Sequence, residues 1–236
     1  MDAFHDDDDD DELARRPEEN GLLQFHNGTE DALLNFVRQQ QSCCASSCND
    51  VLQAMDEFCN TRHWMMHCGP EKANILNDFV LERVRQQHTR SSGPFQVVEL
   101  GTYCGYSTIQ MAATLQKYDF NILTVDINPH FQGIAKQLLD LAGLNKNITF
   151  VLRDKKTLAE LIRNAGIQHV DLLFIDHAKE LYTNDLIHLE QEGLIKAGSA
   201  VVADNIVFFG LVEYRSHMRG LQRQGVVDTK LIDDLF

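Results

Sequence analysis

The segment QVVELGTYCGYS, residues 96–107, decides the fold that we expect for this chain. An apolar, strand-like run ends in a loop that contains Gly101 and Gly105, and a helical pattern follows the loop. A strand that leads through a glycine loop into a helix is typical of open α/β sheets, in which ligands bind beyond the carboxyl ends of the strands. The loop lacks the three-glycine pattern G-x-G-x-x-G, which counts against a nicotinamide dehydrogenase.

Strand-like and helical patterns continue to alternate on the C-terminal side of this segment. The expected strands are residues 96–100, 121–127, 148–152, 170–175 and 200–203. The expected helices between them are residues 107–116, 129–144, 157–165 and 180–192. This order predicts an α/β fold with a doubly wound, mostly parallel sheet, and strands that are apolar on both faces indicate helices on both sides. Residues 226–232 are a candidate last strand before a short C-terminus.

The part of the chain before this segment is expected to be helical, behind an acidic tail. Apolar residues recur at helical spacing over residues 30–40, 49–62 and 70–88. Residues 6–11 are consecutive aspartates, which repel one another and favour a disordered tail over one that binds a basic partner. We therefore predict a tail over residues 1–29 and a single domain over residues 30–236. Within the domain, helices occupy residues 30–90 and the sheet core residues 96–236.

The composition excludes several classes of protein. The 236 residues include 35 acidic and 21 basic residues, a formal net charge of −14, so a nucleic-acid partner is not expected. No apolar run approaches the roughly 20 residues that cross a bilayer, and the acidic start is unlike a secretory signal. We expect a cytoplasmic protein without a membrane segment, with its six cysteines reduced, and favour a monomer over an oligomer.

Acidic residues at the ends of the first two strands indicate a nucleoside ligand that carries positive charge. Glu99 lies at the end of the first strand, where a carboxylate suits an amino or sulfonium group. Asp126 ends the second strand, where an acid commonly accepts hydrogen bonds from ribose hydroxyls. Taken alone, Asp126 could equally cap the helix that begins at Pro129, but the glycine loop before it favours the nucleoside.

The ends of the fourth and fifth strands carry a set of side chains that suits a metal ion. Asp176 follows the fourth strand, and Asp204 and Asn205 follow the fifth. Their oxygens suit magnesium or manganese rather than zinc, although Asp204 and Asn205 alone would more often cap a helix. Lys179 is the candidate general base because a nearby cation disfavours its charged form, and His177 is the alternative base.

Four motifs together resemble the catechol O-methyltransferase family. They are HWMMHCGPEK at residues 63–72, ELGTYCGYS at 99–107, DHAK at 176–179 and ADN at 203–205. The resemblance runs from about residue 51 to residue 220. It implies a seven-stranded class I methyltransferase fold with a final antiparallel strand, S-adenosylmethionine as the methyl donor, and Mg²⁺, or Mn²⁺ in its place, as the metal cofactor. It also implies methyl transfer to one hydroxyl of a small phenolic acceptor of the catechol type.

The resemblance also implies a role for each matching residue. Asp176, Asp204 and Asn205 match the metal ligands, and Lys179 matches the general base. The implied donor site comprises Cys68, through its backbone, together with Glu99, Gly101, Tyr103, Ser107, Asp126, Ile127, Lys155 and Asp176. The implied acceptor site comprises Trp64, Met66, Lys179, Asn205 and Asp234, the last being nearest by spacing to a late glutamate of the family.

Three departures from the family pattern keep other functions open. Ala178 replaces the tryptophan of the motif Asp-His-Trp-Lys, and Lys155 and Lys156 replace small and amide residues near the adenine. The C-terminus is shorter and diverges after Gly220. One alternative is a non-catalytic scaffold with this fold. The other is an O-methyltransferase for a different phenolic acceptor, such as a flavonoid, a caffeoyl-type compound or a hydroxylated amine.

Overall fold

Three helices precede the sheet, as the sequence predicts. The computed structural model describes residues 28–41, 47–88, 93–207 and 211–232. The helices are α1 (Thr29–Gln41), α2 (Cys48–Thr61) and α3 (Gly69–His88). Helix α2 begins at a capping box, in which the Ser47 side chain accepts a hydrogen bond from the Asp50 amide and the Asp50 carboxylate accepts one from the Ser47 amide.

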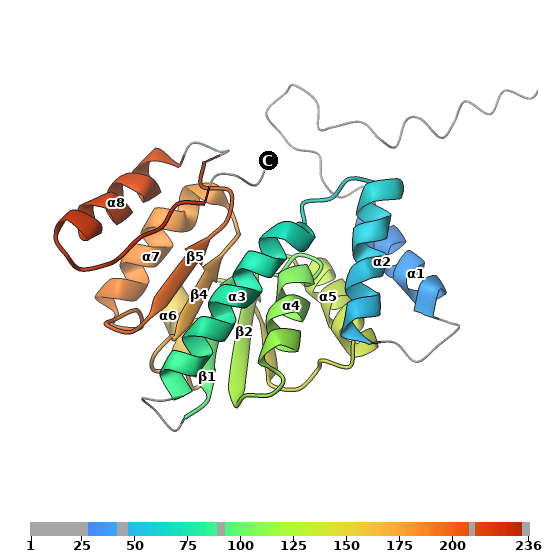
Figure 1. Ribbon diagram of the computed structural model, residues 1–236, viewed down its shortest axis with the longest axis horizontal. Helices are drawn as coiled ribbons and strands as arrows, with labels where there is room; N and C mark the ends of the chain where they lie inside the picture. The colour runs from blue at the N-terminus through green and yellow to red at the C-terminus, as the bar shows by residue number, and fades with distance from the viewer. Residues whose placement is uncertain (1–27, 42–46, 89–92, 208–210, 233–236) are drawn as a thin grey trace, which may run out of the picture.

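The five strands form one parallel sheet, which confirms the predicted doubly wound fold (Figure 1). They are β1 (Phe95–Leu100), β2 (Phe120–Asp126), β3 (Ile148–Leu152), β4 (Leu172–Ile175) and β5 (Ala200–Ala203). Their order is β3-β2-β1-β4-β5, so the direction of winding reverses between β1 and β4. In such sheets a ligand binds beyond the carboxyl ends of the two strands at the reversal.

The two faces of the sheet pack against different helices because successive side chains of a strand point in opposite directions. Val97 belongs to a core that includes α4 (Tyr106–Leu115), α5 (Pro129–Leu141) and the three N-terminal helices. Val98 belongs to a second core with α6 (Leu158–Asn164) and α7 (Tyr182–Gln191). A short 3₁₀ helix, η2 (Lys179–Leu181), leads from β4 into α7.

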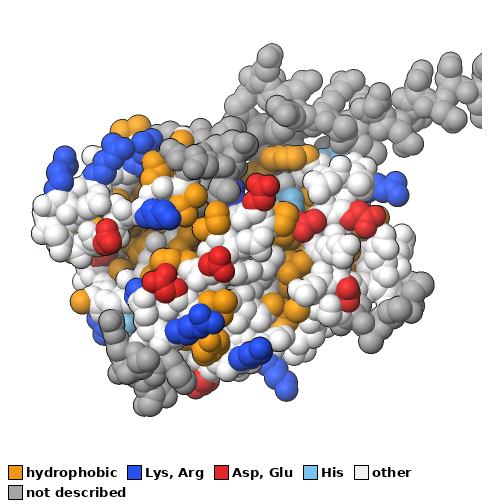
Figure 2. All heavy atoms as spheres, viewed as in Figure 1, with side chains coloured by type: hydrophobic (Ala, Val, Ile, Leu, Met, Phe, Trp, Pro, Cys, Tyr) orange, Lys and Arg blue, Asp and Glu red, His pale blue; other side chains and the backbone are white. Residues whose placement is uncertain are grey.

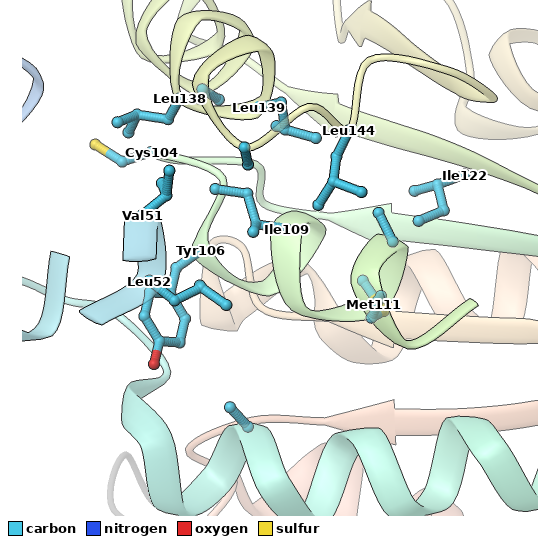
Figure 3. Close-up of a cluster of buried hydrophobic side chains, with 14 of the residues drawn as sticks. Val51, Leu52, Cys104, Tyr106, Ile109, Met111, Ile122, Leu138, Leu139 and Leu144 are labelled. Atoms are coloured by element: carbon cyan, nitrogen blue, oxygen red, sulfur yellow. The ribbon is translucent and has the colours of Figure 1, made fainter. Parts of the chain in front are cut away.

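The first core ties the N-terminal helices to the glycine loop. Figure 3 shows Val51 and Leu52 of α2 beside Cys104 and Tyr106, with Leu138 and Leu139 of α5 above them in this view. Cys104 is 2% exposed in this cluster, so it is a packing residue there. The helices before the sheet therefore form part of the wall around the loop.

The structure corrects the sequence expectations after β5. The described residues contain five strands rather than seven, all of them parallel, and residues 226–232 form no strand. Their apolar side chains Val226, Leu231 and Ile232 are exposed, so this segment neither pairs with a strand nor packs into a hydrophobic core. A helix that the sequence reading missed, α8 (Val212–Arg223), packs against α7 through the buried Tyr214.

The surface carries charges of both signs. On the face shown in Figure 2, acidic and basic side chains are interspersed, and several basic side chains gather over α8, which contains Arg215, Arg219 and Arg223. Among the helices that the structure describes, none is long and apolar enough to cross a membrane.

Candidate active site

A cavity of about 770 Å³ opens at the reversal point of the sheet. The residues that follow β1, β2, β4 and β5 line it, together with the segment that joins α2 to α3. Its volume is within the usual range for a small-molecule or cofactor site. Four of the side chains predicted from the ends of the strands therefore converge on one cavity: Asp126, Asp176, Asp204 and Asn205.

The glycine loop forms one wall of the cavity because two backbones approach closely there. Gly101 has φ +102°, and a Cβ atom on it would lie 2.2 Å from the backbone oxygen of Asp176. A larger residue would push the end of β1 away from the end of β4. Tyr103 adopts φ +45° in the same loop, and its hydroxyl donates to the buried Glu30 of α1 at 2.9 Å. Helix α1 thus holds the loop in place.

Asp126 is oriented toward the cavity by backbone amides rather than used as a helix cap. The amide of Tyr103 donates to one of its oxygens at 2.9 Å, and the amide of Asn128 donates to the other at 2.8 Å. The cap of α5 is Asn128, whose side chain accepts from His130 and Phe131. The capping alternative for Asp126 is therefore wrong, and its carboxylate keeps lone pairs for a ligand.

Glu99 lies beneath the cavity wall and is fully buried. It accepts hydrogen bonds from three hydroxyls, those of Ser107 at 2.6 Å, Thr124 at 2.6 Å and Thr108. Burial raises the pKa of Glu99 to about 7 although these hydrogen bonds oppose the shift. Glu99 is not among the lining residues, whereas Ser107 is, so Glu99 connects β1, β2 and α4 behind the cavity.

The part of the cavity beyond β4 and β5 holds two carboxylates and two lysines. Lys179 donates from Nζ to Asp176 Oδ1 at 2.8 Å, to the Tyr182 hydroxyl at 2.6 Å and to Asn205 Oδ1 at 3.3 Å. Asp176 and Asn205 therefore share one ammonium group. Lys72 of α3 donates to both carboxylate oxygens of Asp204, at 2.9 and 3.2 Å.

The parallel register explains why these side chains meet. Ile175 pairs with Ala203, so Asp176 and Asp204 follow equivalent positions of β4 and β5. Burial raises the pKa of Asp176 and the charge of Asp204 adds to this, while Lys179 and Lys72 oppose it. Two mutually repelling acids are thus placed where positive charge stabilises both.

The oxygens of Asp176, Asp204 and Asn205 suit a hard divalent cation such as Mg²⁺, which accepts carboxylate and amide oxygens. Within the part of the chain that the structure describes, no group of three or more His, Cys, Asp and Glu side chains could hold a metal ion. The predicted set has two acids and one amide, and therefore requires ligands from water or substrate as well.

His177 forms its hydrogen bond with a different carboxylate from the one that Lys179 contacts. Its Nε2 donates to Asp185 at 2.7 Å, and its ring stacks on Tyr182 with centroids 5.2 Å apart. Arg153 donates to both oxygens of Asp185. Burial would raise the pKa of Asp185, but hydrogen bonds from His177 and Arg153 lower it to about 2. His177 is therefore paired with a stable carboxylate, whereas Lys179 contacts the predicted metal ligands.

The remaining predicted residues occupy the mouth of the cavity or lie outside it. Trp64, Met66 and Ile127 line the cavity and are exposed, with Ile127 75% exposed. Cys68 also lines the cavity, and burial raises the pKa of its thiol. Lys155 is exposed and is not among the lining residues. Asp234 lies outside the described residues.

Sequence reasoning gave no role to four residues that the structure brings to the site: Lys72, Arg153, Tyr182 and Asp185. Tyr182 follows Lys179 by three residues, a spacing that places side chains on one helical face and could have indicated their contact. No local signal joins Lys72 to Asp204, because 132 residues separate them.

The chain is similar to known O-methyltransferases over most of its length. The family model described as O-methyltransferase matches residues 45–233. Catechol O-methyltransferase from Mus musculus is 33% identical over 208 residues, which cover 87% of this chain and 73% of that protein. Catechol O-methyltransferase B from Danio rerio is 34% identical over 188 residues, covering 79% and 67%.

Solved structures share the fold at lower identity. The O-methyltransferase from Bacillus cereus in complex with SAH has a TM-score of 0.58 at 20% identity, over 80% of this chain and 86% of that one. The O-methyltransferase TomG from Streptomyces achromogenes, in complex with SAM, has a TM-score of 0.60 at 16% identity, over 81% and 86%. At these identities the likeness concerns the arrangement of helices and strands.

Proposed function

The chain belongs to the O-methyltransferase family, and on this premise we propose that it transfers a methyl group from S-adenosylmethionine to one hydroxyl of a catechol. The proposal is based mainly on one observation: a single cavity is lined by two groups of residues with different chemistry. Asp126 lies beyond β2 on one side of the glycine loop, and the cluster of Asp176, Asn205 and Lys179 lies beyond β4 and β5 on the other side. A nucleoside donor and a metal-chelating acceptor can therefore meet between them.

The donor is held by residues at the ends of β1 and β2. Asp126, already fixed by two backbone amides, accepts the ribose hydroxyls with its remaining lone pairs. Gly101 leaves space for the donor beside the close approach of two strands. Cys68 and Ile127 line the same cavity, where Cys68 would supply backbone contacts to the donor and Ile127 would flank the adenine. The structural neighbours from Bacillus cereus and Streptomyces achromogenes were solved with SAH and SAM respectively, which supports S-adenosylmethionine as the donor.

The acceptor is held beyond β4 and β5. Asp176, Asp204 and Asn205 would hold Mg²⁺, which when bound lowers the pKa of the catechol hydroxyls and fixes both oxygens. Lys179 Nζ takes the proton from the reacting hydroxyl, since it reaches the same oxygens that would face the cation. Trp64 and Met66 at the mouth contact the aromatic ring.

The orientation of donor and acceptor in the cavity supplies most of the rate acceleration. Two reactants held in a near-attack arrangement gain roughly 7–11 kcal/mol over the reaction in solution. Apolar residues around the mouth exclude water, which strengthens the charge interactions around Lys179.

A transfer assay with radiolabelled donor, run on a panel of vicinal diols and matched monophenols with and without Mg²⁺, tests this function. We expect transfer to diols that depends on Mg²⁺ and is lost in Asp176→Asn and Asp204→Asn proteins that retain their circular dichroism spectra. Full turnover of chelator-treated protein would show that the metal assignment is wrong. Failure of donor binding in calorimetry would favour the scaffold alternative.

Methylation of another phenolic acceptor is the second candidate function. The small side chain of Ala178 in the cavity wall favours it. Ala178 lines the cavity and is exposed, and Trp64, which also lines the cavity, is 54% exposed. A small side chain at this position leaves room for acceptors with larger substituents. The same panel, extended with flavonoid and caffeoyl-type diols, distinguishes the two candidates by their relative kcat/KM.

A further inference from the structure

Both carboxylates at the proposed metal site already have an ammonium partner. Lys179 reaches Asp176 and Asn205 from the loop that follows β4, and it has a place in the reaction as the base. Lys72 reaches Asp204 from the first turn of α3, and the proposed reaction gives it no task. Its contact with Asp204 is therefore the observation from which a function for Lys72 can be argued.

The contact between Lys72 and Asp204 would compete with the binding of a cation to Asp204. Lys72 Nζ lies 2.9 and 3.2 Å from the two oxygens of Asp204, so it occupies the same oxygens that a divalent cation would need. The two side chains are 24% and 15% exposed, so water screens their interaction only in part. Lys72 also lies in the first turn of a helix, where positive charge is disfavoured, and Asp204 compensates for this.

The charges of the cluster balance with both lysines protonated. The carboxylates of Asp176 and Asp204 contribute two negative charges, and the two ammonium groups contribute two positive ones. A divalent cation that enters a balanced cluster meets repulsion from both lysines at distances of a few ångströms.

We propose that Lys72 sets the affinity of the site for its divalent cation by competing with the cation for Asp204. The inference rests on the proposed function, because it takes Asp176, Asp204 and Asn205 as the metal ligands. If Lys72 competes in this way, the protein binds the divalent cation weakly when no acceptor is present. An acceptor whose hydroxyl ionises adds negative charge to the cluster and so strengthens the binding of the cation.

Titration with Mn²⁺ alone, followed by the electron paramagnetic resonance signal of the free ion, tests this without turnover. Lys72→Met keeps the length of the side chain without its charge, and Lys72→Gln keeps a polar end. Both should bind Mn²⁺ about tenfold or more tightly than the original chain. Lys72→Arg keeps the charge and should stay within about threefold. Lys117→Met, an exposed lysine just after α4, is the matched control and should change nothing.

The outcomes separate this inference from the proposed function. Unchanged or weaker Mn²⁺ binding in folded Lys72→Met and Lys72→Gln, with loss of binding in Asp204→Asn, would overturn the role of Lys72 alone. Binding that is unaffected by Asp204→Asn and Asp176→Asn would show that the metal is not held here, and both proposals would then fail. Thermal unfolding followed by circular dichroism confirms that each variant is folded.

Discussion

At the scale of single residues, Lys179 carries the sharpest prediction. Lys179→Ala should lower turnover by roughly 10²–10⁴, the usual contribution of a positioned base, because no other described lysine contacts both Asp176 and Asn205. Donor affinity should hardly change, since Asp126 lies on the other side of the glycine loop. Lys179→Arg should fail nearly as badly because a guanidinium keeps its proton. Steady-state kinetics with donor binding by calorimetry measures both effects.

His177 provides the contrasting variant for that experiment. Its Nε2 donates to Asp185, so His177→Ala should reduce turnover far less than Lys179→Ala does. If His177→Ala abolishes activity while Lys179→Ala keeps it, the base is the histidine and the role given to Lys179 is wrong.

Tyr182 is predicted to position Lys179. Its hydroxyl accepts from Lys179 Nζ at 2.6 Å, and the ring is fully buried between His177 and Tyr214. Tyr182→Phe keeps the ring and removes only the hydroxyl, so kcat should fall by roughly tenfold while KM for the donor stays constant. The free energy of unfolding should fall by about 1–3 kcal/mol, because the hydroxyl also donates to Asp176 Oδ1 and to the backbone oxygen of Asp204.

Tyr214→Phe is the matched control for Tyr182, because this second tyrosine packs edge-on against the first. It should leave kcat unchanged. An equal loss of kcat in both variants would show that Tyr182 acts through general packing and not through its hydroxyl.

At the scale of elements, Glu99 joins β1, β2 and α4 through three hydroxyls and should make their stability depend on pH. Its pKa is about 7 in the folded protein, above the usual value for an unfolded glutamate. The folded state then binds more protons between about pH 4.5 and pH 7, so stability falls as pH rises through this window. Above pH 7 the loss in the free energy of unfolding is complete and is on the order of a few kcal/mol.

Urea unfolding at pH 5 and pH 8 measures this loss. Glu99→Gln cannot titrate, so the fall in the free energy of unfolding between the two pH values should be smaller in the variant than in the original chain. His67, whose pKa is raised to about 10, contributes equally to both proteins and cancels in the comparison. Equal falls in both proteins would show that Glu99 does not control the pH dependence.

At the scale of the whole molecule, the acidic tail is predicted to be dispensable for the chemistry. Residues 1–27 lie outside the described part of the chain, and charges on them are screened beyond about 8 Å at physiological salt. Deleting these residues should leave kcat within about twofold for a neutral acceptor. A tenfold loss would instead assign the tail a role at the cavity.

Deletion through residue 41 is the contrasting variant. It removes α1, whose Glu30 accepts the hydrogen bond from Tyr103 and whose Leu33 and Val37 are buried in the first core. We expect this protein to lose both stability and donor binding. The comparison separates a tail without function from a helix that supports the glycine loop.

The sequence by itself determined the order of the elements and the ends of the strands. Short apolar runs alternate with helical patterns, and that local periodicity predicted all five strands and the helices between them. The carboxyl ends of parallel strands lie at the same edge of the sheet. The sequence pattern therefore also predicted that Asp126, Asp176 and Asp204 face the same cavity. Local patterns sufficed because each depends on residues close together in the chain.

Only the tertiary structure decided which partner each of these side chains has. It placed Glu99 behind the wall, assigned the α5 cap to Asn128 and paired Lys72 with Asp204 across 132 residues. It also left residues 226–232 without a strand partner, although their apolar pattern predicted one. Such contacts depend on the packing of distant elements, because burial and hydrogen-bond partners are set by neighbours in space that no local spacing in the sequence specifies.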